Sequence, residues 1–141
     1  MIAGLWSLGA VAEASASISS VDQCPPKVQL NDKKFFSRKM QPLLDERCVM
    51  CHMTGAENGG LNLEAKVAVS NLVNQPSTET SNLKRVMAGS PNQSYLMRKL
   101  DGTHIDAGGQ GDRMPLNNAP LNEDEMARIT AWICALPKPA R

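Results

Sequence analysis

Apolar residues recur along this chain three and four positions apart, which is the spacing of a helix face and not the alternating spacing of a strand. Four stretches show this pattern. They cover residues 35–52, 63–72, 90–100 and 122–136. The stretches between them are rich in glycine, asparagine and proline, above all 53–62 and 103–119, and we expect them to be loops. The pattern predicts an all-α domain with long loops.

Pro42 interrupts the first of these stretches. A proline inside a helix removes a backbone hydrogen bond and clashes with the preceding turn, but it is tolerated at the first helical position. We therefore expect one short helix to end near Gln41 and a second to begin at Pro42. The second helix is expected to carry Cys48 and Cys51.

The last stretch carries the clearest helix signals. Asn122 can cap the helix, and Glu125, three residues later, completes a capping box. Leu121 can then pack against Met126, and Pro137 ends the helix. The apolar stripe consists of Met126, Ile129, Ile133 and Leu136. We expect this helix to bury that stripe in the core.

The N-terminal part of the chain falls outside the helical pattern. Residues 1–12 are apolar, but a membrane-spanning helix needs ~20 such residues. The Ala-Ser-Ala at 14–16 resembles the cleavage site of a secretory leader, although no Lys or Arg precedes the apolar run. Two interpretations stay open: a leader-like segment, or a retained segment that docks on a partner. We divide the chain into this apolar segment and polar extension, 1–34, and a domain over 35–141.

Composition excludes some classes of function. The net charge is only +1, from 15 basic and 14 acidic residues, so no strong field draws the chain to nucleic acid or to anionic lipid. Aromatic residues make up 4% of the chain, so the core needs bulk from elsewhere. Eight methionines supply some of it, and a large apolar cofactor can supply more.

Cys48, Cys51 and His52 form a CxxCH sequence that is consistent with three chemistries. A structural zinc site usually needs four Cys or His ligands, and the other candidates, Cys24, His104 and Cys134, are single and distant in sequence. A thioredoxin-type CxxC follows a strand in a βαβ unit, and no such strand is predicted. The third chemistry, c-type haem, fits best: two cysteines three positions apart form thioethers, and the next residue, His52, is aimed at the iron.

A haem iron bound by histidine needs a sixth ligand, and a methionine sulfur in that position raises the reduction potential. Met114 is the candidate, because it lies in a loop beside Pro115 and 62 positions after His52. His104, also in a loop, is the rival ligand; otherwise we expect it to be exposed or to hydrogen-bond near a haem propionate. The candidates to pair with the propionates are Lys84, Arg85, Arg98 and Arg113, with a slight preference for Arg113 beside Met114.

Five segments resemble a known family in their order along the chain. They are QPLLDERCVMCH, GGLNLE, GSPNQSYLMRKL, RMP and LNEDEMARITAWI, which together lie within 35–136. With them the chain resembles class I c-type cytochromes, most of all the planctomycete-type cytochrome c domain. The resemblance implies a compact cytochrome c fold with long loops around one covalently bound haem c. It implies Cys48 and Cys51 as thioether anchors, His52 as proximal ligand and Met114 as distal ligand.

The resemblance also implies that the first and last helices of the domain cross. Trp132 and Ile133 would then be buried against the apolar face of residues 35–44. Two features depart from the family: the segment before Phe35, and Cys134 in the last helix. We hypothesise that Cys24 and Cys134 form a disulfide, which would suit an exported protein.

These expectations lead to electron transfer, not to an enzyme. We expect a periplasmic location, or the outer face of the cytoplasmic membrane. The partner is a larger respiratory or other redox complex, of which the chain is a subunit or dedicated partner; membrane association would come only through that partner or the N-terminal segment. A freely diffusing periplasmic carrier is the alternative, and a haem sensor or haem enzyme with an open sixth site is a further one.

Overall fold

The computed structural model of the chain describes Cys24 and residues 32–138, and within this part helices and loops form the whole fold. The α-helices are α1 (Asp32–Phe35), α2 (Gln41–Arg47), α3 (Ala68–Leu72), α4 (Tyr95–Asp101) and α5 (Glu123–Ala135). A π-helix, η1 (Phe36–Met40), and three single 3-10 turns, η2 (Asn58–Gly60), η3 (Pro91–Gln93) and η4 (Ile105–Ala107), complete the set. The described residues contain isolated β-bridges but no strand, which confirms the all-α prediction.

The expected break at Pro42 is wrong. Met40 and Gln41 keep right-handed helical backbone angles, so α1, η1 and α2 form one continuous helical run. Its middle is widened instead: the Gln41 N–H donates to the carbonyl of Phe36, five residues back. This π-turn comes directly before the proline, where the ordinary hydrogen-bond ladder is interrupted. The domain boundary drawn at Phe35 therefore falls inside this helical run.

The α-helical part of the run, α2, resumes at Gln41, one residue before the predicted start, but it ends earlier than predicted. α2 stops at Arg47, and Cys48 has a non-helical φ of −135°. Cys48 and Cys51 therefore lie in the turn after the helix. The predicted helix over 63–72 is also shorter, at Ala68–Leu72, as is the one over 90–100.

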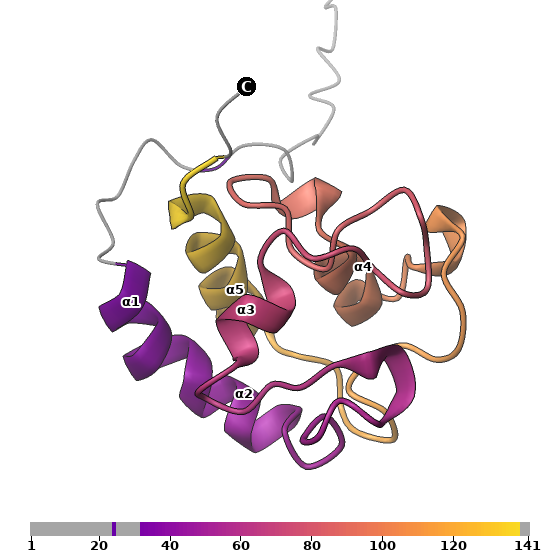
Figure 1. Cartoon of the computed structure of the whole chain (residues 1–141), viewed down its shortest axis with the longest axis horizontal. Coiled ribbons are helices and arrows are strands. Elements are labelled where there is room, and N and C mark those ends of the chain that lie inside the picture. Colours follow the sequence, from indigo (N-terminus) through magenta and orange to yellow (C-terminus); the bar gives the residue numbers. More distant parts are fainter. Residues whose placement is uncertain (1–23, 25–31, 139–141) are drawn as a thin grey trace, which may run out of the picture.

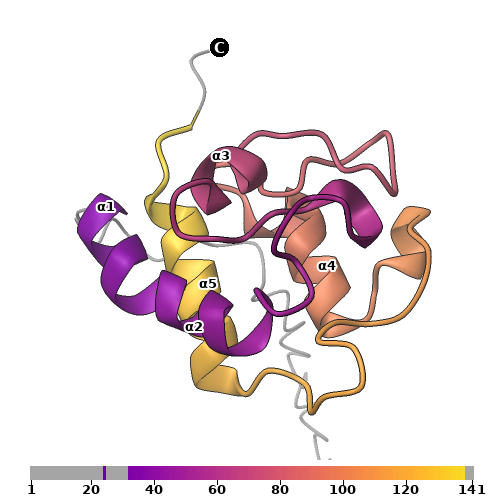
Figure 2. The same ribbon diagram turned by 60° about the horizontal axis from the view of Figure 1, so that its bottom comes forward.

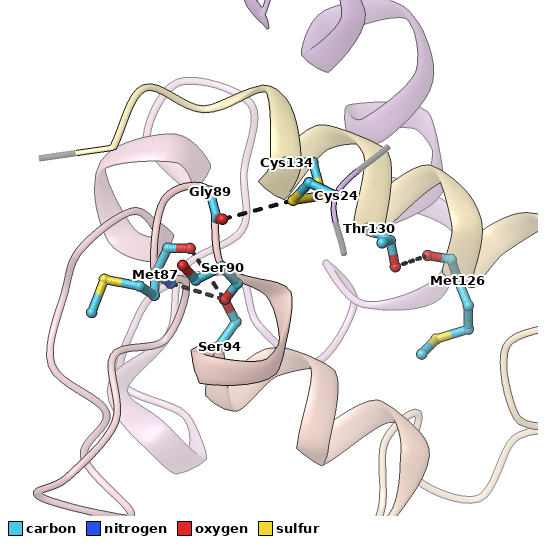
Figure 3. Close-up of a disulfide and its surroundings, with 8 residues drawn as sticks. All are labelled: Cys24, Met87, Gly89, Ser90, Ser94, Met126, Thr130 and Cys134. Atoms are coloured by element: carbon cyan, nitrogen blue, oxygen red, sulfur yellow. Dashed lines mark hydrogen bonds between the residues drawn. A yellow bond between two sulfur atoms is a disulfide. The ribbon is translucent and has the colours of Figure 1, made fainter. Parts of the chain in front are cut away.

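Ser94 explains why the helix predicted over 90–100 is delayed. Its backbone is extended, and its buried hydroxyl accepts from the Met87 N–H at 2.9 Å and donates to the Ser90 carbonyl at 2.9 Å (Figure 3). The side chain thus ties the two preceding turns together, as Ser side chains do when they compete with helix formation. α4 begins only at Tyr95.

α5 crosses the helical run formed by α1, η1 and α2, and both views show the two packed together (Figures 1 and 2). The Phe36 and Trp132 rings meet at a centroid distance of 5.1 Å, and Trp132 is 1% exposed. Met40 and Ile133 are fully buried in the same core. The crossing of first and last helices, which the resemblance implies, is therefore present.

The capping of α5 follows the prediction. The Asn122 side chain accepts from the Glu125 N–H at 2.9 Å, and the Glu125 carboxylate accepts from the Asn122 N–H at 2.8 Å. Leu121 and Leu136 are buried at the two ends of the helix. Met126, however, is only half-buried, whereas Trp132, which is not in the predicted stripe, is buried.

Cys24 and Cys134 are joined by a disulfide, with an S–S distance of 2.03 Å and Cα atoms 5.3 Å apart (Figure 3). Cys24 also lies 3.7 Å from the carbonyl oxygen of Gly89. The pairing agrees with the hypothesis made from the sequence, and it attaches Cys24 to α5. The two interpretations of residues 1–16 fall outside the described residues. Among the described helices, none is long and apolar enough to cross a membrane.

Replacing both Cys24 and Cys134 by serine is expected to lower the free energy of unfolding by ~4–5 kcal/mol, because the bond closes a loop across 110 residues. Urea unfolding of the oxidised protein and of the double variant measures the difference. Alkylation followed by intact mass provides the control: in the unreduced protein these two cysteines should not react. Their reaction before reduction would rule the pairing out.

Candidate functional site

The four residues predicted as haem ligands or anchors line one cavity of about 320 Å³. Cys48, Cys51 and His52 come from the turn after α2, and Met114 comes from the loop between α4 and α5. Much of the remaining wall is apolar. It includes Leu61, Leu63, Leu72, Leu96, Leu100, Pro115 and Leu116. The size and the apolar lining are typical of a pocket for a small molecule or cofactor.

Backbone hydrogen bonds on both sides position His52. Its N–H donates to the carbonyls of Cys48 and Val49 at 3.1 and 3.0 Å. Its own carbonyl accepts from the Leu63 N–H at 2.8 Å, and the Leu63 carbonyl accepts from the buried Gln41 amide at 2.9 Å. A side chain of α2 therefore holds the loop that carries the histidine.

The His52 ring is half-buried, and burial lowers its pKa below the usual value, although the Glu57 carboxylate opposes the shift. Its Nδ1 atom is buried and has no hydrogen-bond partner in the described part of the chain. A neutral imidazole is the form that binds a metal ion. Burial therefore favours the neutral form of the ring.

The two cysteines differ in environment. Cys48 is half-buried, and burial raises the pKa of its thiol to about 11, while Cys51 is exposed. A thiol with so high a pKa is a poor thiolate nucleophile, which disfavours thiol exchange. The described residues contain no group of three or more His, Cys, Asp or Glu side chains that could hold a metal ion.

Met114 is fixed to the end of α4. Its N–H donates to the Lys99 carbonyl at 2.9 Å, and the neighbouring Arg113 Nε donates to the Leu100 carbonyl at 2.8 Å. The side chain is half-buried and packs against the core, and the peptide bond to Pro115 is cis. The thioether is therefore held at the wall of the cavity that His52 also lines.

His104 does not line this cavity. It is 3% exposed, so the expectation of an exposed histidine is wrong, and its Nε2–H donates to the Gly111 carbonyl at 2.9 Å. The hydrogen bond fixes the chain three residues before Met114. His104 therefore holds the loop through this hydrogen bond and does not line the cavity beside His52.

Among the four cationic candidates for the propionates, Arg85 lines the cavity. Its guanidinium donates to the carbonyls of Gly59 and Gly60 at 2.7 and 3.0 Å, and to that of Asn71 at 3.1 Å. Arg113, the slightly preferred candidate, does not line this cavity; its Nε donates to the Leu100 carbonyl at 2.8 Å, and it borders a second hollow along the Met114 loop.

Sequence reasoning missed a polar cluster on the cavity wall, formed by Glu79, Tyr95 and Lys99. The Lys99 ammonium lies 2.8 Å from the Glu79 carboxylate, the Tyr95 hydroxyl donates to the same carboxylate, and Lys99 also donates to the Gln110 carbonyl. Burial alone would raise the pKa of Glu79, but the hydrogen bonds from Lys99 and Tyr95 outweigh it and lower the pKa. The available signal was the four-residue spacing of Tyr95 and Lys99, which places both on one helix face.

A second cation on the wall, Arg47, was also missed. Its Nη2 donates to the Ala119 carbonyl at 2.8 Å, and its Nε lies 3.8 Å from the Glu125 carboxylate. Arg47 directly precedes Cys48, so it links the turn of the CxxCH sequence to the chain after Met114 and to the start of α5.

The cavity brings four potential ligand or anchor groups together. An imidazole and a thioether line an apolar cavity together with two thiols that are not in a disulfide. These are the groups that a covalently attached haem with His/Met ligation requires. No family model, curated protein or solved structure matches this chain, so the interpretation of the site depends on its own residues.

Proposed function

We propose that this chain is a mono-haem c-type cytochrome with the class I cytochrome c fold, and that it transfers electrons. The observation that carries the proposal is the meeting of Cys48, Cys51, His52 and Met114 at one cavity, although Met114 lies 62 positions after His52. The crossing of α5 over the N-terminal helical run supports the same fold.

In this proposal Cys48 and Cys51 anchor the porphyrin through thioethers, and His52 and Met114 are the axial ligands. A bound haem supplies an iron that gains and loses one electron. The leucines of the wall would exclude water from the cavity, and Arg85, which lines it, is the cation that we propose to pair with a propionate. If His52 and Met114 both held the iron, no position would remain open for a substrate, which favours an electron carrier over a haem enzyme or gas sensor.

We propose further that the protein works in the periplasm or at the outer face of the cytoplasmic membrane. The disulfide between Cys24 and Cys134 supports an oxidising compartment. We favour a subunit or dedicated partner of a larger redox complex, with a freely diffusing carrier as the alternative. Native mass spectrometry of soluble and membrane-associated fractions distinguishes the two, since a lone holoprotein in the soluble fraction would contradict the complex.

The test is to produce the full chain with an export signal and the haem c attachment machinery. We expect a coloured protein that keeps its haem on a denaturing gel and titrates reversibly as a one-electron couple. The ferric form should show the weak long-wavelength band of sulfur-ligated haem. A folded but colourless protein with free thiols at Cys48 and Cys51 would reject the proposal.

A further inference from the structure

The loop that carries Met114 is held by charged side chains at two places. Upstream, Lys99 donates to the Gln110 carbonyl and pairs with Glu79; downstream, Arg47 donates to the Ala119 carbonyl at 2.8 Å. The Lys99–Glu79 pair is the closer ion pair, at 2.8 Å against 3.8 Å for Arg47 with Glu125. The cation at the upstream contact therefore has the closer carboxylate partner.

Lys99 constrains the loop twice. Its ammonium donates to the carbonyl of Gln110, and its backbone carbonyl accepts from the N–H of Met114 at 2.9 Å. Both contacts depend on where Lys99 lies in α4. If the Lys99 side chain moves, the segment between Gln110 and Met114 therefore loses one of its two contacts with α4.

Lys99 is 9% exposed, so its ammonium has little access to water. A buried ammonium needs an opposite charge and hydrogen-bond acceptors, and removing only its partner leaves an uncompensated buried charge. Glu79 supplies the charge from the chain between α3 and η3, which is distant in sequence from both α4 and the Met114 loop. Without it, Lys99 must turn toward solvent and release Gln110.

The loop is also packed closely on this cluster at Gly109. A Cβ at this position would lie 2.2 Å from the Tyr95 hydroxyl and 2.8 Å from the His104 carbonyl, so no side chain fits there. The Tyr95 hydroxyl in turn donates to Glu79. The steric fit and the ion pair thus act on the same part of the loop.

We propose that Glu79 is a positioning residue for Met114: by holding Lys99, it fixes the loop that presents the thioether to the cavity. This inference deepens the proposed function and depends on it for the role of Met114 as an axial ligand. Glu79 itself touches neither His52 nor Met114 through a hydrogen bond. Its effect passes through Lys99 and through its own hydrogen bond to the Gln110 backbone, which lies in the same loop.

The test compares Glu79→Gln with a matched control, Glu64→Gln, in the full-length holoprotein. Glu64 is an exposed carboxylate whose hydrogen-bond partner is the neighbouring Asn62, so its variant removes the same charge away from the loop. Hydrogen exchange of peptides covering 111–116 should be ~10-fold faster in Glu79→Gln and unchanged in the control. The long-wavelength sulfur band should weaken in Glu79→Gln alone.

Lys99→Met provides the second variant. If Glu79 acts through Lys99, the double variant Glu79→Gln with Lys99→Met should exchange no faster than the stronger single variant, because the two changes break one interaction. Tyr95→Phe removes only one donor to the carboxylate and is expected to give a smaller change in the same direction. If Glu79→Gln does not fold, Tyr95→Phe still tests whether weakening the contacts of Glu79 speeds exchange in the Met114 loop.

Exchange rates and a sulfur band in Glu79→Gln that match the Glu64→Gln control would overturn the inference, as would fully additive effects of Glu79→Gln and Lys99→Met. A wild-type protein without haem or without the sulfur band would overturn the proposed function instead. In that case the exchange comparison, which needs no haem, still decides whether Glu79 fixes the Met114 loop.

Discussion

Replacing Cys48 and Cys51 together by serine is expected to abolish covalent haem attachment, whereas replacing Cys24 and Cys134 together should leave it intact. The first pair lines the cavity beside His52, and neither cysteine is engaged in a disulfide. The second pair forms the disulfide between α5 and the N-terminal extension. Serine cannot form the thioether bonds that anchor a haem c, so the loss should be complete.

Haem staining on a denaturing gel, normalised to protein, measures this difference. The two double variants are matched, because each exchanges two cysteines for serines in the same chain. Loss of staining in both variants would mean that folding, not attachment, had failed, and circular dichroism identifies that case. Retained staining without Cys48 and Cys51 would remove the basis for the proposed cofactor.

Met114→Ala should abolish the long-wavelength sulfur band and lower the reduction potential. A methionine axial ligand raises the potential of a haem iron, and axial ligands set potentials over a range of ≈ 0.8 V. We therefore expect a drop on the order of 0.1–0.3 V, together with binding of added imidazole at the vacated position. Potentiometric titration followed by visible absorption measures both changes.

Met50→Ala is the control for this prediction. Met50 also borders the cavity, but its side chain is 86% exposed and lies between the two cysteines. Its removal should leave the sulfur band and the potential unchanged. A wild-type band that persists in Met114→Ala and disappears in another methionine variant would show that the sixth ligand had been assigned to the wrong residue.

Local sequence signals were sufficient for several features. The capping box of Asn122 and Glu125 formed as predicted, because its two hydrogen bonds join residues only three positions apart. Cys48, Cys51 and His52 lie close together because they are neighbours in sequence, although in the turn after α2 and not in the helix as predicted. Met114 lies in a loop, as its neighbouring glycines and proline predict, and it lines the same cavity as His52.

Other features depended on contacts that no local pattern records. Pro42 predicted a break, but packing of Phe36 and Met40 beneath α5 favours a continuous helix, and the chain adapts with a π-turn. His104 looked like an exposed loop residue and is buried against Gly111. In the first case the gain from burying apolar side chains outweighed the local preference. In the second, a hydrogen bond to the Gly111 carbonyl allows the histidine to be buried.

The sequence by itself determined the helical class and the cap of α5, since both follow from residue type and short spacing. Only the tertiary structure decided how the cavity is held. Lys99 contacts Glu79 from 20 positions away, and Arg47 contacts Ala119 from 72. A buried cation is stable only beside an acceptor or opposite charge, and the fold alone determines which distant residue supplies it.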